Sequence, residues 1–357
     1  MKCGDGGRLM SGADSKLRSR VGASWIVLPF IAALLVVGCS KPPSGSSNSR
    51  SKVSIGIQVS PAMILLMVAK EKGFFEQQGL DVELKQFTAG KFALQAFFGG
   101  SVDYAVSGEV PVCLAVLQGN QARVVAQVVE RTIDEVRIVA RNKGGKTIPA
   151  DPAAYFRQNK QRLATSFGGG PEFFTYNFLQ HYKIAPNQVE ILSQRPEDMP
   201  ASLASKSVDA VSIFDPFAFI AERQLGHDAV TFRASDLYSE LYVLAAHPKQ
   251  TDQDGATITA ILRALQQAES FTAEHPEEAK QILQMYTKLD SDIVNGIWGN
   301  FSFKIALTKD LLSDWNAEAK WAKETGKVTP QTQVPDFTKF VDSSFLEKID
   351  PGSVKLQ

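Results

Sequence analysis

The chain has 357 residues, which is enough for one large or two ordinary domains. Apolar residues make up 44% and charged residues 21% of the sequence, proportions typical of a globular protein and not of a disordered one. The formal net charge is zero, so we do not expect nucleic acid as a partner.

The first forty residues have the pattern of an export signal. Basic residues up to Arg20 precede an apolar stretch over 21–37, and small residues follow at the predicted cleavage point. We predict that residues 1–38 are a signal peptide and that translation begins at Met1 or Met10. A single-pass membrane anchor is the alternative, but the apolar stretch is barely long enough to span a bilayer.

The end of this segment, Val-Val-Gly-Cys39-Ser, resembles the lipobox of bacterial lipoproteins. The resemblance implies cleavage before Cys39 and lipidation of its thiol. The protein would then be exported and held on a cell membrane, facing the periplasm or the cell exterior. Residues 39–52, rich in Ser, Pro and Gly, are predicted to form a flexible tether.

Strands and helices alternate from residue 53 onward. Apolar or alternating stretches predict strands, and longer stretches between glycine- and proline-containing turns predict helices. Repeated β-α-β units imply a mostly parallel sheet with both faces covered. The predicted strands are 53–59, 81–87, 104–107, 123–129 and 135–140, and the predicted helices are 61–75, 91–98 and one that ends at Gln118.

A second α/β run follows a loop-like stretch at 142–145. A strand at 241–245 is predicted to cross back, and everything after Thr251 is predicted to be helical. Two crossings, near residues 140 and 235, would form a hinge between two lobes. The predicted strands of this run are 162–167, 189–192, 210–213 and 229–232; the helices are 171–182, 196–205 and 216–225, followed by 256–274, 276–286, 291–298 and 308–324.

Two segments of the chain nearly repeat each other. Residues 97–111 and 203–216 each end a helix, pass through Ser-Val-Asp into a short apolar strand, and place a carboxylate six residues after that aspartate. The two carboxylates are Glu109 and Asp215. In open α/β sheets, ligands bind beyond the carboxyl ends of the strands. We therefore expect two α/β lobes that face one cleft.

Four stretches, taken in order, are similar to one family. Residues 70–83, 99–104, 184–191 and 207–216 resemble bacterial ABC-transporter substrate-binding proteins of the branch for nitrate, sulfonate, taurine and thiamine-pyrimidine precursors. The resemblance spans roughly residues 53–285. It implies a two-lobed periplasmic-binding-protein fold of type II, α/β in class, with an ABC permease, an ATPase and a small-molecule ligand as partners. We expect a monomer.

The predicted domains follow from the crossings and the family. Lobe one comprises residues 53–140 plus 235–357 with the C-terminal helices, and lobe two comprises residues 141–234. Two departures from the family pattern leave the ligand open. Many members have Trp where this chain has Phe214, and the first-lobe turn is often Gly-Asp/Ser-xxx-Pro where this chain has Ser107-Gly-Glu-Val-Pro111.

Two carboxylates are the first candidates for ligand contact. Glu109 and Asp215 could each hold a cationic or amine group between the lobes through a charge-assisted hydrogen bond. The alternative is that each one caps the helix that follows it, because each comes just before a helix with proline near its start.

Two glycine-containing turns are candidates for binding an anion. Residues 88–90 and 166–171 each connect a strand to a helix, where backbone N–H groups converge. The alternative is that their glycines only allow tight turns. Lys91 could add a positive charge, and Tyr238 and Glu240 could close the cleft. The predicted ligand-binding residues are Ser60, Thr88, Gly90, Ser107, Gly108, Glu109, Phe167, Gly168, Gly169, Gly170, Phe214 and Asp215.

The sequence indicates binding and not catalysis. Its four histidines lack metal-ligand spacing, and no nucleophile-elbow or cofactor motif is present, so we expect neither a metal nor a cofactor. We expect capture of a sulfonate- or taurine-like solute, or of a nitrogen heterocycle, for delivery to the permease. Nitrate ranks low because two facing carboxylates repel a bare anion. The alternatives are an enzyme of pyrimidine or thiamine-precursor metabolism on the same fold, and a ligand sensor for a membrane kinase.

Overall fold

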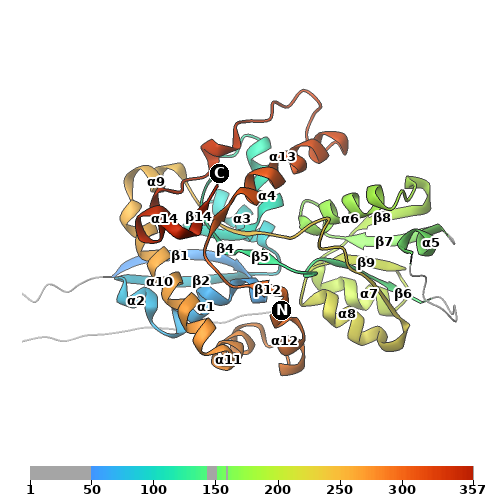
Figure 1. Ribbon diagram of the computed structural model, residues 1–357, viewed down its shortest axis with the longest axis horizontal. Coiled ribbons are helices and arrows are strands. Elements are labelled where there is room, and N and C mark those ends of the chain that lie inside the picture. Colours follow the sequence, from blue (N-terminus) through green and yellow to red (C-terminus); the bar gives the residue numbers. More distant parts are fainter. Residues whose placement is uncertain (1–49, 143–150, 158–159, 357) are drawn as a thin grey trace, which may run out of the picture. The chain divides into compact units, whose positions relative to one another are not determined.

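The computed structural model describes residues 50–142, 151–157 and 160–356. These residues form two five-stranded sheets, each flanked by helices (Figure 1). The predicted signal peptide, Cys39 and nearly all of the tether lie outside the described residues, as does the loop at 142–145 beyond Asn142. No helix in the described part of the chain is long and apolar enough to cross a membrane.

The first sheet has the strand order β2-β1-β3-β11-β4. β1, β2 and β3 are parallel, and β11 is antiparallel to both β3 and β4. Four strands therefore run in one direction, and β11, which returns from the second lobe, runs against them. The bounds are β1 Ser51–Gln58, β2 Leu80–Phe87, β3 Tyr104–Gly108, β4 Arg123–Val129 and β11 Tyr242–Ala246.

The second sheet repeats this topology with the order β8-β7-β9-β6-β10. β7, β8 and β9 are parallel, and β6 is antiparallel to both β9 and β10. Here β6 is the strand that arrives from the other lobe. The prediction of mostly parallel sheets is confirmed, because in each sheet all strands but one run in the same direction. The bounds are β6 Arg137–Arg141, β7 Gln161–Thr165, β8 Val189–Ser193, β9 Ala210–Ile213 and β10 Ala229–Phe232.

The position of β6 corrects the first crossing. The sequence places the stretch 135–140 in lobe one, but β6 pairs with β9 and β10 in the second sheet. The chain therefore changes sheets between the end of β4 and the start of β6, and β5 (Arg131–Thr132) lies within this crossing. An apolar strand fits either sheet equally well, so its pattern alone does not reveal its partners.

The helices of the two lobes cover these sheets. The single helix predicted over 61–75 is divided, because Gly73 adopts a left-handed φ of +70° between α1 and α2. In lobe one the helices are η1 Pro61–Met63, α1 Ile64–Glu71, α2 Phe74–Gln77, α3 Gly90–Phe98 and α4 Glu109–Leu117. In lobe two they are α5 Pro152–Arg157, α6 Gly170–His181, η2 Pro186–Gln188, η3 Pro196–Asp198, α7 Met199–Ala204, α8 Phe217–Leu225 and η4 Gly226–Asp228.

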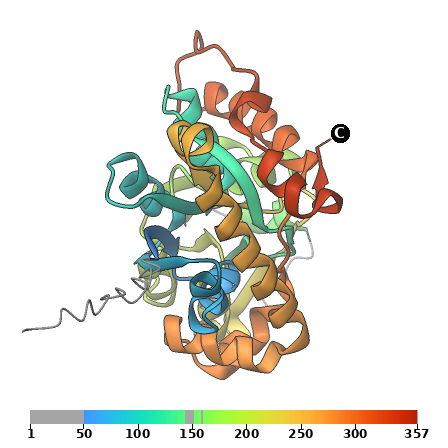
Figure 2. The same ribbon diagram turned by 90° about the vertical axis from the view of Figure 1, so that its left-hand side faces the viewer.

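The C-terminal part packs on both lobes. α10 lies along α1 and α2 (Figure 2), α13 packs on α4, and α12 packs on α8 of lobe two. The part predicted to be all helical also contains three two-residue strands. The helices are α9 Pro248–Gln253, α10 Gly255–Glu274, α11 Pro276–Thr287, α12 Ser291–Ile297, η5 Trp298–Asn300, α13 Lys309–Glu324, η6 Phe337–Phe340, α14 Ser344–Ile349 and η7 Pro351–Ser353, and the strands are β12 Phe301–Ser302, β13 Leu307–Thr308 and β14 Val354–Lys355.

Candidate functional site

The space between the lobes lies beyond the ends of β3 and β7 and is almost filled by protein. A cavity of about 20 Å³ remains there, close to the room that one water molecule needs. Five of the predicted ligand-binding residues line it, together with residues of both lobes and of the second crossing. Its lining comprises Gln58, Ala89, Gly90, Lys91, Gly108, Pro111, Ser166, Gly169, Gly170, Pro171, Phe214 and Glu240.

Glu240 fills the centre of this cleft. It precedes β11 on the returning crossing and is 5% exposed. Its carboxylate lies between two glycines: a Cβ on Gly108 would be 2.3 Å from Glu240 Oε1, and one on Gly170 would be 2.9 Å from the same atom. Both glycines are therefore needed to make room for a protein carboxylate.

We expect Gly170→Ala to lower the free energy of unfolding by roughly 1–3 kcal/mol, the usual cost of inserting a methyl group into a packed interior. The added Cβ would be 2.3 Å from the Tyr238 hydroxyl oxygen and 2.8 Å from Glu240 Cδ. Gly299→Ala is the matched control, because no atom lies within 4 Å of a Cβ there. Urea unfolding of both variants measures the difference, and equal stabilities would contradict this packing.

Three buried glutamates lie close to one another, and one of them, Glu240, lines the cleft cavity. Glu109, Glu135 and Glu240 come from the start of α4, the first crossing and the second crossing. Burial, followed by the neighbouring carboxylates, raises the pKa of Glu240 well above its usual value, against the opposing effect of the Tyr242 hydroxyl. Burial also raises the pKa of Glu135, although Tyr242 donates a 2.7 Å hydrogen bond to it. Within the described residues, Glu135 Oε2 and Glu240 Oε2 have no hydrogen-bond partner.

Glu109 is fully buried and bonded to the second crossing. The Tyr238 hydroxyl donates to Oε1 at 2.5 Å and the Leu241 backbone N–H donates to Oε2 at 2.8 Å. Burial raises the pKa of Glu109 to about 8, against the opposing effect of the Tyr238 hydrogen bond. In this conformation its carboxyl group connects α4 to the hinge, and ligand contact by Glu109 stays a prediction.

Asp215 is also bonded to protein groups. Arg137 of β6 donates to it from two guanidinium nitrogens, each at 2.9 Å, and the Asn300 side-chain amide donates at 2.7 Å. Burial raises the pKa of Asp215, and Arg137 and Asn300 act in the opposite direction. Asp215 also accepts from the Phe219 backbone N–H within α8, so the predicted capping role is present. Its role in ligand binding stays a prediction.

The two predicted anion-binding turns already contain oxygen acceptors from the protein. At the start of α3, the Gly90 N–H donates to Gln58 Oε1 at 2.8 Å. At the turn before α6, the Gly168 N–H donates to Glu172 Oε2 at 2.7 Å. Gly168 itself needs glycine for its φ of +74°. An anion at either turn would compete with a side chain that is already bonded there.

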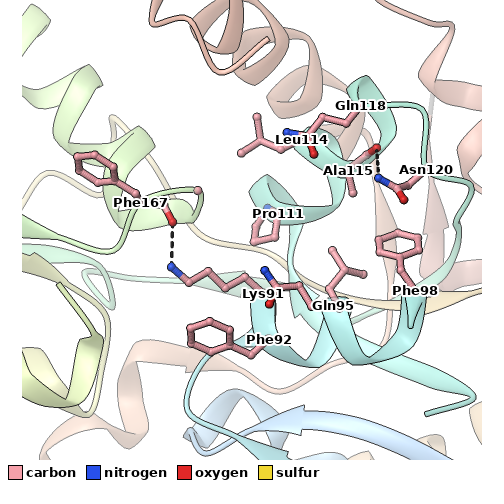
Figure 3. A pocket seen from close by; sticks show the side chains of 12 residues that line it. Lys91, Phe92, Gln95, Phe98, Pro111, Leu114, Ala115, Gln118, Asn120 and Phe167 are labelled. Carbon is pink, nitrogen blue, oxygen red and sulfur yellow. Dashed lines mark hydrogen bonds between the residues drawn. The ribbon is translucent and has the colours of Figure 1, made fainter. Parts of the chain in front are cut away.

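Lys91 of α3 crosses from lobe one to lobe two. Its ammonium group donates to Ser166 Oγ at 3.0 Å and to the Phe167 carbonyl at 2.9 Å, and Figure 3 shows the second bond. Burial lowers the pKa of Lys91, against the opposing effects of Glu172 and Glu197. Lys91 thus connects the lobes at the edge of the cleft.

The remaining predicted residues differ in exposure. Ser60 is buried and caps η1 by accepting from the Ala62 N–H at 3.1 Å. Ser107 is buried, and its hydroxyl has no partner in the described part of the chain. Thr88 is exposed, whereas Phe214 lines the cleft cavity. Gln58 and Glu135 are absent from the predicted set because no motif marks them.

A larger cavity of about 460 Å³ opens beside the cleft (Figure 3). Its walls come from α3, from α4 and from the turn at Phe167 and Gly168. It shares Lys91 and Pro111 with the cleft cavity. The lining residues are Lys91, Phe92, Leu94, Gln95, Phe98, Pro111, Leu114, Ala115, Gln118, Asn120, Phe167 and Gly168.

No group of three or more His, Cys, Asp or Glu side chains within the described ranges is placed to hold a metal ion. The chemistry that the cleft offers is therefore that of hydrogen bonding and charge, supplied by buried carboxylates, one lysine and the hydroxyl groups of two serines.

A comparison with protein-family models identifies the family of this chain. Residues 60–279, more than half of the sequence, match the model described as NMT1/THI5 like. The chain belongs to the NMT1/THI5-like family. This match covers both near-repeat segments and every predicted ligand-binding residue.

Curated relatives of this NMT1/THI5-like chain carry the names of binding proteins. It is 23% identical over 334 residues to the putative aliphatic sulfonates-binding protein of Bacillus subtilis, a match that covers 90% of this chain and 96% of the relative. It is 24% identical over 267 residues to the formylaminopyrimidine-binding protein of Halalkalibacterium halodurans, covering 72% and 77% of the two chains.

Solved structures show the same fold. The periplasmic aliphatic sulphonate binding protein SsuA of Escherichia coli aligns with a TM-score of 0.69 at 20% identity, over 80% of this chain and 96% of that one. The nitrate-binding protein NrtA of Synechocystis PCC 6803 aligns with a TM-score of 0.68 at 16% identity, over 84% and 88%. The predicted type II periplasmic-binding-protein fold is confirmed.

Proposed function

We propose that this protein is the solute-binding component of an ABC importer and that its solute presents hydrogen-bond donors or a positive charge to Glu240. The observation that carries this proposal is the Glu240 carboxylate itself. It is buried between two glycines in the interlobe cleft, and its Oε2 lacks a hydrogen-bond partner within the described residues. A buried acceptor without a donor is costly, and a donor on the solute would relieve that cost.

Family and fold support the transport part of the proposal. The chain belongs to the NMT1/THI5-like family, and relatives over most of its length are named for binding sulfonates or formylaminopyrimidine. Export by the signal peptide and lipidation at Cys39 would keep the protein at the membrane beside its permease and ATPase. We expect it to act as a monomer.

The polar groups of the cleft favour a nitrogenous solute over a bare anion. The Gly90 and Gly168 N–H groups already donate to Gln58 and Glu172. Ser107 Oγ and Glu240 Oε2 are buried, have no partner in the described part of the chain, and can accept hydrogen bonds. An aminopyrimidine or an amine offers N–H donors to such acceptors, whereas nitrate offers none.

A sulfonate is the second candidate, and Lys91 is the observation that favours it. Lys91 is the positive charge that lines the cleft cavity, and it is bonded to Ser166 and to the Phe167 carbonyl. A sulfonate could replace these two acceptors. It would then lie close to Glu240, so an amine on the same solute, as in taurine, would be needed to balance that carboxylate.

Binding would act through closure of the lobes. Lys91 bonds to lobe two only when the lobes are together, and Glu240 and Tyr238 come from the crossing that connects them. A solute that contacts both lobes stabilises the closed arrangement, because only that arrangement completes its hydrogen bonds. The closed form would then be the one that the permease recognises.

Thermal-shift and calorimetric titrations of the purified protein test the proposal. The panel comprises 4-amino-2-methylpyrimidine, butylammonium, taurine, ethanesulfonate and nitrate. We expect the nitrogenous compounds to raise the melting temperature and Glu240→Gln to weaken their binding at least tenfold, since a bound cation would favour ionisation of Glu240 and pair with its carboxylate, whereas glutamine has no charge to offer. The exposed Glu190→Gln is the matched control.

The other outcomes separate the alternatives. Shifts by ethanesulfonate and nitrate that Glu240→Gln leaves unchanged would contradict the donor-bearing solute and favour a plain anion. Conversion of the aminopyrimidine during titration would favour the enzyme alternative.

A further inference from the structure

The large cavity beside the cleft is bounded by an unusually apolar helix. From Val110 to Leu117, every side chain of α4 is apolar. Helices that are apolar on all sides are normally enclosed on all sides. α3, α6 and α13 pack against α4, but Leu114 and Ala115 also line the 460 Å³ cavity. One side of α4 therefore borders a space that no protein segment fills within the described residues.

The wall opposite α4 is apolar as well. Phe92 and Phe98 of α3 line the cavity, and Phe167 of lobe two, 37% exposed, also belongs to its lining, although its ring points away from α3 and α4 (Figure 3). Gln95 and Gln118, which also line the cavity, are exposed. The cavity is thus an apolar groove with a polar rim, within the range of about 300–1,000 Å³ that small-molecule pockets span.

The groove adjoins the cleft. Both cavities are lined by Lys91 and Pro111, and the Lys91 side chain reaches past the groove to its bonds with Ser166 and Phe167. The cleft cavity of about 20 Å³ has room for a small polar group only. The groove is the neighbouring space that could hold the rest of a molecule whose polar end lies at Glu240.

We propose that this groove binds the apolar tail of the solute, so that the protein selects amphipathic nitrogenous molecules with a donor-bearing head and a tail of several carbons. The proposal rests on the proposed function for the position of the head. The tail would pack against Leu114 and Ala115 of α4 and against Phe92 and Phe98 of α3, and it would reach the polar side chains of Gln95 and Gln118. Specificity would then have two separable parts, the head at Glu240 and the tail in the groove.

The test is a series of primary n-alkylammonium ions, from ethylammonium to octylammonium, titrated by calorimetry into the whole protein. We expect the affinity to increase about threefold to fourfold per methylene until the groove is filled. Gln95→Trp places a large side chain in the groove from an exposed position, and we expect it to reduce the gain from ethyl to octyl to less than threefold. Gln281→Trp, exposed on α11 away from the groove, is the matched control and should keep the full gain.

Glu240→Gln tests the head separately. It should weaken every member of the series by a similar factor and leave the dependence on chain length intact. If wild-type affinity does not depend on chain length, or if Gln95→Trp keeps that dependence, the groove proposal is overturned while the proposed function stands. If the length dependence is present but Glu240→Gln has no effect, the groove is supported and the donor-bearing head is wrong. If no alkylammonium ion binds at any length, the groove proposal fails, and the aminopyrimidine and taurine titrations decide the proposed function.

Discussion

Replacing Arg137 with methionine should lower the free energy of unfolding by about 3–5 kcal/mol, the range found when one partner of a buried ion pair is removed. The Arg137 side chain is 2% exposed and bonds to Asp215, which is fully buried, and to Glu222. Burial alone would lower the pKa of Arg137, but the two carboxylates raise it. Without the guanidinium, the remaining donors to Asp215 among the described residues would be the Asn300 amide and the Phe219 N–H.

Two further variants separate charge from packing. Arg233→Met removes a half-exposed arginine that also bonds to Glu222, at 2.8 Å, and should change stability by less than about 1 kcal/mol. Arg137→Met combined with Asp215→Asn leaves no unpaired carboxylate and should recover part of the loss. Urea unfolding measures all three. A value for Arg137→Met within 1 kcal/mol of the wild type would mean that this ion pair does not stabilise the hinge side of lobe two.

The aspartates of the two near-repeat segments explain why the fold is visible in the sequence. Asp103 accepts from the Ser54 N–H of β1 at 2.7 Å, and Asp209 accepts from the Arg162 N–H of β7 at 2.8 Å. Each aspartate thus connects the start of the strand that follows it, β3 or β9, to the neighbouring parallel strand, β1 or β7. Turn, aspartate and strand lie within a few residues of one another, so a local pattern predicts the shared topology of both lobes.

The hydrogen-bond partners of the two candidate carboxylates cannot be predicted from a local sequence pattern. Glu109 meets Tyr238 from a position 129 residues away, and Asp215 meets Arg137 across 78 residues. The sequence correctly places both carboxylates at the ends of matching strands and predicts the capping by Asp215. It does not predict that a donor from another segment would already be bonded to each carboxylate.

The glycines and Glu240 show a second limit of what the sequence alone can predict about the site. Successive glycines at 168–170 indicate a close approach of a ligand to the backbone, and ligand contact there stays a prediction. The approaching groups in the structure are the Tyr238 hydroxyl and the Glu240 carboxylate at Gly170, and the Glu172 carboxylate at the Gly168 N–H. Which atom uses the space left by a missing Cβ depends on tertiary packing, and a glycine pattern does not encode it.

The stability of this protein should fall as the pH rises from about 5 to 8, because Glu109 is buried with its pKa raised to about 8. In the unfolded chain the same group titrates near 4.5. Below pH 4.5 it is protonated in both states and has no effect on stability. Between 4.5 and 8 the unfolded chain releases the proton that the folded protein keeps, so unfolding becomes more favourable by up to about 1.4 kcal/mol per pH unit. Above 8 the contribution of Glu109 is constant.

The neighbours of Glu109 act in the same direction. Asp314 and Glu318 of α13 face it, and burial raises the pKa of both, that of Asp314 to about 7. Burial also raises the pKa of Glu135 and Glu240 at the crossings. Exposed carboxylates have finished titrating by about pH 5.5, so they do not mask the effect. We expect the free energy of unfolding at pH 5.5 to exceed that at pH 8 by at least about 3 kcal/mol, measured by urea titration at four pH values.

Glu109→Gln should reduce this pH dependence. Glutamine keeps an oxygen that can accept from Tyr238 or from the Leu241 N–H, but it has no proton to lose, so the slope should decrease by about 1 kcal/mol per pH unit. The exposed Glu190→Gln should leave the slope unchanged. If stability instead rises between pH 5.5 and 8, the carboxyl groups around the hinge are ionised in the folded protein. The hydrogen bond from Tyr238 to Glu109 would then be one between a hydroxyl and a carboxylate anion, stronger than its neutral counterpart, and opening of the lobes would have to break it.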